Sequence, residues 1–176
     1  MVQLTSAEAA KILKKLNEEL SSVISKEEQS KDFLAAMGED PETVRPKYDY
    51  EDTSKKIDEL ETKIRILKHS INVFNTTTIV PEINMTVDQV LIYIPQLTKK
   101  CNKLLDMINK LPKAREIATG FGRASSIIDY RYINYNTEQV ERDYYKCKSE
   151  LDRAQIQLDL VNSTVQLSIE ESVVEG

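Results

Sequence analysis

Apolar residues recur at alternating spacings of three and four positions in four separate stretches of the chain. This heptad pattern predicts amphipathic helices, each with one apolar seam. The four stretches cover residues 6–37, 49–75, 87–111 and 137–162. Helices of this length that alternate in direction predict a mainly α protein, an elongated, coiled-coil-like antiparallel bundle of four long helices. We expect a single helical domain over residues 1–176.

The second, third and fourth seams keep one phase along their whole length. Their members are Tyr50, Thr53, Ile57, Leu60, Ile64, Leu67, Ile71 and Phe74; Val87, Val90, Ile94, Leu97, Cys101, Leu104, Ile108 and Leu111; and Val140, Tyr144, Cys147, Leu151, Ala154, Leu158 and Val161. The first seam is less regular, because Glu27 and Ser30 occupy positions that the pattern assigns to apolar residues. We therefore expect part of the first helix to leave the bundle or to contact a partner.

Short motifs mark where the helices begin and end. Pairs of the capping-box type, which satisfy the first free N–H groups of a helix, are Thr5 with Glu8, Thr86 with Gln89 and, in a weaker form, Asn136 with Gln139. Gly38 follows the first helix and Pro112 closes the third. Pro95 lies inside the third helix and is expected to kink it or to divide it in two.

Two stretches favour β-strands. Residues 126–134 are β-branched and aromatic, and residues 164–170 alternate apolar with polar side chains. In an antiparallel bundle these strands lie at opposite ends, too far apart to pair with each other. The second strand can pair with residues 77–80, which the same alternation places at its own end, or with another subunit.

Composition restricts the class of protein. Hydrophobic residues make up 40% of the chain and charged residues 30%, which is too apolar for general disorder and too charged for a membrane protein. No stretch approaches the roughly 20 apolar residues that span a bilayer, and the first ten residues lack the pattern of a secretory leader. We expect a cytoplasmic protein without membrane contact. The net charge of −5 gives no overall reason to expect nucleic acid.

Charge is unevenly distributed along the chain. Residues 38–61 hold nine acids and four bases, whereas residues 97–123 hold seven bases and two acids. Alternating helices place these two segments at the same end of a bundle. The favoured interpretation is that they neutralise each other there.

The inventory for catalysis or metal binding is small. His69 is the only histidine and lies off the apolar seam, so we interpret it as a solvated surface residue. Cys101 and Cys147 fall on the seams and are interpreted as reduced core thiols. These residues do not make a usual zinc site or a nucleophile triad. We therefore assign no catalytic residue, metal or cofactor.

Basic residues surround a short glycine motif. Gly120-Phe121-Gly122 can bring backbone amides close to an anion, and Lys110, Lys113, Arg115 and Arg123 lie nearby as possible anion-binding residues. The motif lacks the lysine and the strand–loop–helix context of a P-loop. A turn between helix and strand is the favoured interpretation, and phosphate binding is the alternative.

Two further groups of side chains are candidates for binding. Tyr130, Tyr132 and Tyr135 are interleaved with Arg131, and such tyrosines form a packing surface at a subunit interface or, alternatively, stack on the bases of single strands. Asn72, Asn75 and Thr78 form a polar group at the end of the second helix. We interpret the asparagines as capping groups, with a buried cluster that fixes the register between subunits as the alternative.

A series of motifs appears in order along most of the chain. Gly38-Glu39-Asp40-Pro41 precedes the second helix, which ends in Ile71-Asn72-x-x-Asn75-x-x-Thr78; a capped helix, an Ile/Tyr strand and a long helix follow. From about residue 6 to about residue 168 the chain thereby resembles the bacterial septicolysin-like family of uncharacterised helical proteins. The resemblance implies a helical fold. The family's name suggests a pore-forming toxin, but we adopt no such activity, because the sequence shows no membrane-active segment.

Three functional hypotheses follow, and the first is favoured. It is a non-enzymatic, self-associating helical scaffold or protein-interaction protein, as the sustained heptads and the irregular first seam indicate. The alternative is a protein that binds nucleic acid or a phosphate ligand through residues 99–123 and the tyrosines. The third is an enzyme of unknown reaction with a site near Asn72 and Asn75.

Overall fold

The computed structural model describes residues 1–116 and 129–174, and these residues are mainly helical with a few short strands, as the sequence predicted. The helices are α1 (Ser6–Ser30), α2 (Pro41–Val44), α3 (Tyr50–Thr77), α4 (Val87–Ile108), α5 (Thr137–Thr164) and α6 (Glu171–Val174). The strands are β1 (Val2–Thr5), β2 (Ile79–Val80), β3 (Met85–Thr86), β4 (Lys113–Arg115), β5 (Tyr130–Tyr132) and β6 (Gln166–Ile169).

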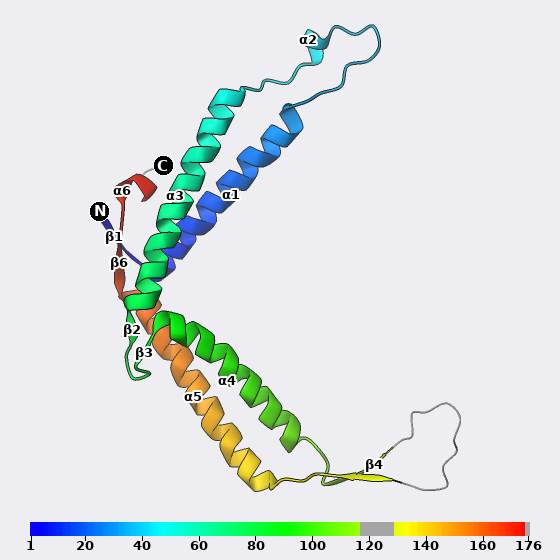
Figure 1. The fold of residues 1–176 in the computed structure, drawn as a ribbon, viewed down its shortest axis with the longest axis vertical. Helices are drawn as coiled ribbons and strands as arrows, with labels where there is room; N and C mark the ends of the chain where they lie inside the picture. Colours follow the sequence, from blue (N-terminus) through cyan, green and yellow to red (C-terminus); the bar gives the residue numbers. More distant parts are fainter. Residues whose placement is uncertain (117–128, 175–176) are drawn as a thin grey trace.

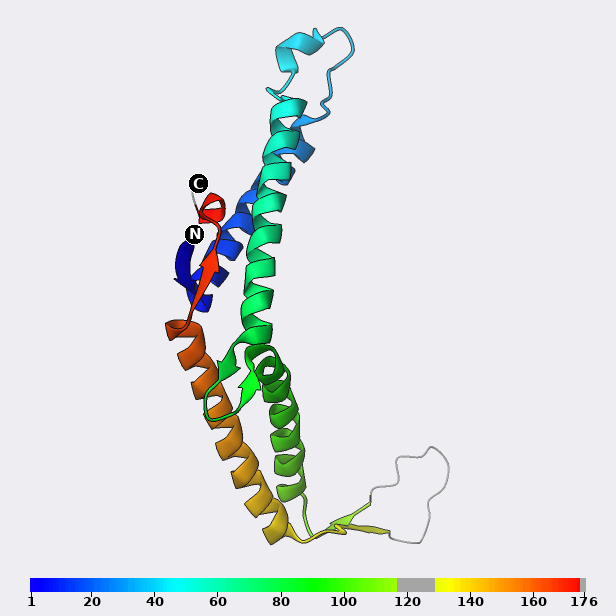
Figure 2. The same ribbon diagram turned by 60° about the vertical axis from the view of Figure 1, so that its left-hand side comes forward.

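The long helices form two hairpins that extend in different directions from a shared joint (Figure 1). In one hairpin α1 lies against α3, and in the other α4 lies against α5. Figure 2 shows the same division from another side. A single bundle in which all four helices lie side by side is therefore not confirmed. The reason lies at the link between α3 and α4, where the small β2–β3 hairpin starts α4 in a new direction.

The main hydrophobic core fills the joint and the adjoining part of the first hairpin. It combines residues from both hairpins and from the strands: Ala9, Leu16, Leu60, Ile64, Leu67, Phe74, Val80, Val87, Val90, Leu158, Val161, Leu167, Ile169 and Val173. Strand β6 pairs antiparallel with β1, from Val2 opposite Ile169 to Thr5 opposite Gln166. Its alternation is the one expected of a half-buried strand, because Leu167 and Ile169 face the core whereas Gln166 and Ser168 face water.

A second, smaller core lies between α4 and α5. Its buried members are Leu97, Cys101, Cys147, Leu151 and Ala154, all of them seam residues. The seam pattern thus correctly identified the buried faces of these two helices. The expected helix starts are confirmed as well, because Thr5 and Thr86 form capping boxes and Asn136 caps α5 by accepting from the N–H of Gln139.

Several helix boundaries differ from the prediction. The first helix ends at Ser30 rather than residue 37, because the polar seam position Glu27 binds the hydroxyl of Tyr48 instead of packing, and Leu34 and Met37 beyond it lie in water. The third helix ends at Ile108 rather than residue 111, where Leu111 is exposed. The second and fourth helices each run two residues further than predicted, to residues 77 and 164. Helix α4 is continuous through Pro95.

The strands formed, but their partners differ from those expected. The predicted strand over residues 164–170 appears as β6, which pairs with β1 and not with residues 77–80. Residues 79–80 instead pair with residues 85–86. Of the predicted strand over residues 126–134, the described part contains β5, which pairs with β4; residues 126–128 lie outside the described residues.

The two segments of opposite charge lie at opposite extremes of the molecule, which corrects the expectation that they meet. The acidic segment lies where α1 ends and α3 begins, near α2, and the described part of the basic segment lies where α4 ends, near β4 (Figure 1). The hairpins point away from each other, so the bases do not neutralise the acids within one molecule. Among the described helices, none is long and apolar enough to cross a membrane.

Candidate functional site

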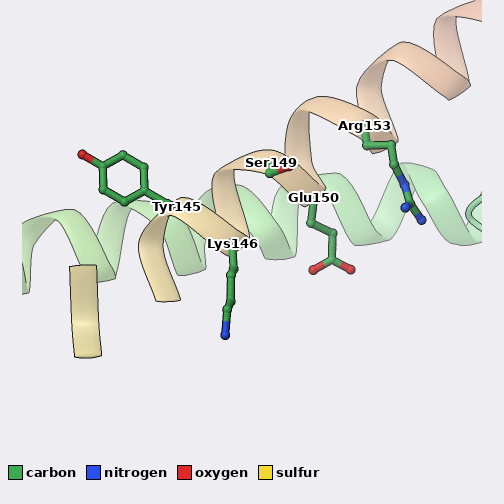
Figure 3. A pocket seen from close by; sticks show the side chains of 5 residues that line it. All are labelled: Tyr145, Lys146, Ser149, Glu150 and Arg153. Carbon is green, nitrogen blue, oxygen red and sulfur yellow. The ribbon is translucent and has the colours of Figure 1, made fainter. Parts of the chain in front are cut away.

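A shallow depression of about 510 Å³ lies on the surface of α5. Figure 3 shows its five lining side chains projecting in different directions from this one helix. Two of them have structural partners: Glu150 accepts a hydrogen bond from the Tyr93 hydroxyl, and Arg153 donates to the carbonyl oxygen of Glu82 at 2.9 Å. The bond to Glu150 raises the pKa of Tyr93 to about 12. These contacts fasten α5 to α4 and to the β2–β3 turn, so we assign the depression no function.

The two cysteines face each other inside the α4–α5 core. Their Sγ atoms lie 2.8 Å apart, both thiols are free, and Cys147 also approaches the carbonyl oxygen of Leu97 at 3.5 Å. Burial, followed by the hydrogen bond with Cys101, raises the pKa of Cys147 to about 11. A thiol with such a pKa is neutral at pH 7 and is therefore a poor nucleophile and a poor metal ligand.

Metal ligands do not converge in the described part of the chain. No group of three or more histidine, cysteine, aspartate or glutamate side chains there is arranged to hold an ion. His69 lies exposed on α3, as the sequence predicted.

Asn72, Asn75 and Thr78 lie around the end of α3. Asn72 is exposed, and the other two are half-buried. Thr78 caps the helix: its N–H donates to the carbonyl oxygen of Phe74, and its own carbonyl accepts from the N–H of Val87 at 3.0 Å. No hydrogen bond joins the three side chains in the structure as described. Their observed contacts are those of a connection between α3 and α4.

A more promising group of residues lies between the end of α4 and the start of α5, away from the joint. Here β4 and β5 form an antiparallel ribbon in which Lys113 is opposite Tyr132, and Arg115 is opposite Tyr130. Because alternate residues of a strand face the same side, these four side chains share one face of the ribbon. The Nζ atom of Lys113 lies 4.1 Å from the ring centroid of Tyr130 and 5.5 Å from that of Tyr132. Arg123 lies outside the described residues.

The other face of the ribbon carries Ala114 and Arg131. The guanidinium of Arg131 binds the carboxylate of Glu116 with two hydrogen bonds of 2.7 and 2.8 Å, and this contact lowers the pKa of Glu116. The backbone N–H of Glu116 also donates to the carbonyl oxygen of Asp129 at 2.9 Å. This face is therefore partly neutralised, in contrast to the cationic face with Lys113 and Arg115.

Where the ribbon joins the helices, a pocket of about 400 Å³ opens. Its apolar and aromatic walls come from Leu111, Ala114, Tyr132, Ile133 and Tyr135, and the polar residues Lys110, Arg131 and Asn134 also line it. Two hydrogen bonds hold the walls in place: the Tyr135 hydroxyl donates to the carbonyl oxygen of Met107 at 2.7 Å, and the N–H of Ile133 donates to the carbonyl oxygen of Pro112 at 3.3 Å. We call residues 110–116 and 129–135 together the basic arm.

The basic arm brings together residues that the sequence had placed in separate groups. Lys110, Lys113 and Arg115 were predicted as an anion site, and Tyr130, Tyr132 and Tyr135 as an interface. Sequence reasoning did not identify the pocket, because Leu111 was assigned to a helix seam and Ile133 to a strand. Their neighbouring tyrosines were the only signal in the sequence.

Comparison with known proteins reveals one protein of similar fold, but it does not indicate what activity this chain has. No family model and no curated protein matches the chain, so the resemblance to the septicolysin-like family stays a prediction. One solved structure is similar over 95% of this chain and 100% of its own length, with a TM-score of 0.60 and 17% sequence identity. It is a functionally unknown conserved protein from Corynebacterium diphtheriae. At that identity the likeness concerns the fold alone.

Proposed function

We propose that this protein is a non-enzymatic, self-associating helical scaffold. The observation that carries the proposal is the amount of surface that the open fold leaves in water. The chain exposes 13131 Å², whereas a compact monomer of 20.2 kDa exposes about 8,800 Å². The excess is larger than the roughly 1,200–2,000 Å² that a specific interface buries in total. This shape therefore has room for more than one contact between molecules.

Apolar side chains at the far ends of both hairpins support the proposal. Isolated exposed apolar residues are ordinary on a protein surface, but here several gather at each end. At the end near α2 they are Leu34, Met37 and Tyr50, and at the basic arm they are Leu111, Tyr130 and Tyr132. Clusters of this kind at the extremes of an elongated molecule are suited to contacts with other molecules.

Sedimentation velocity over a range of concentrations tests this proposal. From about 1 to about 100 µM, where interfaces of ordinary size associate, we expect the weight-average mass to rise from 20.2 kDa to multiples of it. Nuclease treatment is included as a control and should leave the masses unchanged. A monomer at every concentration would contradict the proposal.

The second candidate function is binding of single-stranded nucleic acid. The observation that favours it is the cationic face of the ribbon, where two lysine or arginine side chains lie on the same side as two tyrosine rings. Cations bind phosphates, and exposed rings stack on bases. The pairing of Lys113 with the rings weakens this candidate, since a base must displace the ammonium group to stack there.

Fluorescence anisotropy with a labelled single-stranded oligonucleotide tests the second candidate. We expect binding at low salt that weakens steeply as the salt concentration rises. The double variant Lys113→Ser with Arg115→Ser should bind more weakly. The matched control, Lys146→Ser with Lys148→Ser, removes the same amount of charge from α5 and should leave the affinity for the oligonucleotide unchanged. An equal loss of affinity in both double variants would show that binding responds only to net charge, and it would count against a binding site on the basic arm.

A further inference from the structure

The segment that joins α1 to α3 presents two fully exposed apolar side chains. We call residues 31–49 the acidic tip. Leu34 is 95% exposed, and Met37 is as exposed as in an extended peptide. Acidic residues flank them on both sides (Asp32, Glu39, Asp40 and Glu42), and no lysine or arginine occurs from residue 32 to residue 44. Glu42 is ion-paired with Arg45 at 2.6 Å and contributes less attraction than the other three.

A hydrogen-bonded turn holds Met37 outward. The N–H of Glu39 donates to the carbonyl oxygen of Ala36 at 3.0 Å, and the N–H of Ala36 donates to the Glu39 carboxylate at 2.9 Å. Gly38, with φ +90°, supplies the left-handed conformation that this turn requires. Behind the turn, the Arg45 guanidinium covers the ring of Phe33 at 5.1 Å. The loop is thus organised before it meets a partner, which lowers the entropy cost of binding.

The pocket of the basic arm has the complementary chemistry. Most of its lining side chains are apolar or aromatic. Its volume of about 400 Å³ falls in the range of pockets that accept a whole small molecule, so two aliphatic side chains fit. Lys110 lines it. Lys113 and Arg115 lie on the same strand as Ala114 but on the opposite face of the ribbon, so their charges add to the positive field of the arm without entering the pocket. Arg131 is already paired with Glu116 and contributes less attraction.

We propose that Met37 and Leu34 of one molecule insert into the basic-arm pocket of a second copy of this chain. The proposal rests on the self-association argued above and names its interface. The acidic tip and the basic arm lie at opposite extremes of one molecule, so the tip does not reach its own pocket (Figure 1). Charge complementarity therefore acts between molecules. Each copy has one tip and one pocket, and the contact is head-to-tail.

A head-to-tail contact has consequences that a symmetric contact lacks. In a symmetric dimer the same patch is buried on both partners, and association stops at two. Here each added copy leaves one tip and one pocket free, so assembly continues into chains or closes into a ring. Because acids face bases across the contact, raising the salt concentration should weaken it.

Two substitutions at exposed positions separate the two sides of the contact. Met37→Asp disables the tip, and Leu111→Asp places a charge at the mouth of the pocket, where Leu111 is 69% exposed. We expect each to weaken self-association about tenfold or more, as charge in the centre of an interface does. The matched control is Ile156→Asp on the outer face of α5, which is similarly exposed and should behave as wild type. Circular dichroism should show the same helicity for all three.

Mixing the two variants gives the decisive result. The Leu111→Asp molecule still has an intact tip, and the Met37→Asp molecule still has an intact pocket. Sedimentation of the equimolar mixture should therefore yield a one-to-one dimer and nothing larger. Variants that assemble like wild type, or a mixture that stays monomeric, would overturn the head-to-tail contact while self-association itself stands. A monomeric wild type would refute both. Loss of assembly after nuclease treatment would show nucleic acid, not the tip, joining the molecules.

Discussion

The α1–α3 and α4–α5 hairpins are built from helices of similar length, yet they bury their seams over different distances. In the first hairpin the last buried residue of α1 is Leu16, although the helix continues to Ser30, and the first buried residue of α3 is Leu60, ten residues after its start. In the second hairpin, α5 is buried from Val140, close to its start, to Val161. The first hairpin is therefore well packed only near the joint.

The two hairpins differ in seam burial because their seam residues face different kinds of side chain. Toward the acidic tip, Glu27 binds the hydroxyl of Tyr48, and Lys56 binds Glu19 at 3.0 Å. The first contact joins α1 to the segment before α3, and the second joins α1 to α3. Both are polar, and they replace apolar contacts. In the α4–α5 hairpin apolar residues face apolar residues at successive turns, for instance Leu97 and Cys101 with Cys147 and Leu151. A heptad position is buried only where the opposing helix supplies an apolar partner.

The largest expected effect comes from a substitution in the joint. Leu67 is fully buried in the main core, so Leu67→Ala should lower the free energy of unfolding by about 3 kcal/mol. Ile24→Ala, at a 41% exposed position toward the acidic tip, should cost less than about 1 kcal/mol. Urea denaturation of both variants measures the contrast. Equal losses would mean that the tip half of the first hairpin is as well packed as the joint.

Hydrogen exchange should show the same contrast without any substitution. Amides of residues 20–30 in α1 are expected to exchange much faster than those of residues 144–154 in α5, because the unburied end of α1 opens without unfolding the core. Mass spectrometry of peptides from these two segments makes the comparison. Similar protection in both segments would refute local opening at the tip.

A smaller effect should appear at alkaline pH in the second hairpin. The pKa of Cys147 is raised from 9.0 to about 11 by burial and by the bond with Cys101, so the unfolded chain loses this proton at a lower pH than the folded protein. The contribution of this thiol to stability is thus complete below pH 9 and falls as the pH rises toward 11. The stability difference between wild type and Cys147→Ala, measured under reducing conditions, should shrink over that range. A constant difference would show that the thiol is not shielded from water.

The smallest effects concern two similar hydrogen bonds. Tyr93 donates to Glu150 in the second hairpin, and Tyr48 donates to Glu27 at the acidic tip; both bonds raise the pKa of the tyrosine to about 12. Tyr93→Phe should reduce stability by about 1 kcal/mol. Tyr48→Phe should change global stability less, because the tip opens before the core unfolds. Thermal melts of both variants at pH 7 measure the two losses of stability. A larger loss for Tyr48→Phe than for Tyr93→Phe would contradict the difference between the two hairpins.

Much of the local structure was predictable from the sequence. Capping residues such as Thr5 and Thr86 act on their own first turn, so they need no information from the rest of the chain. Seam residues such as Leu60 and Leu67 were identified correctly because burial follows helical periodicity. Strand β1 was missed because it is four residues long and gains its stability from β6, which lies near the other end of the chain.

The binding site was only partly predictable. The bases and tyrosines of the basic arm were identified as candidates, since residue type alone indicates affinity for anions and aromatic packing. The pocket was not predicted, because it depends on how Leu111, which follows α4, and Ile133, which precedes α5, come together. The acidic tip appeared in the sequence as a charged connection, and the exposure of Met37 emerged only with the turn that holds it.

The sequence by itself determined where the four long helices lie, where they start and which face of each is apolar, because these properties depend on contacts within a few turns. The tertiary structure decided how the helices are shared between two hairpins, which strands pair and where the charged segments lie. Those properties depend on the β2–β3 hairpin, which directs α4 away from α3. An acidic and a basic segment that a single bundle would have joined are thereby held at opposite ends, where each is available to another molecule.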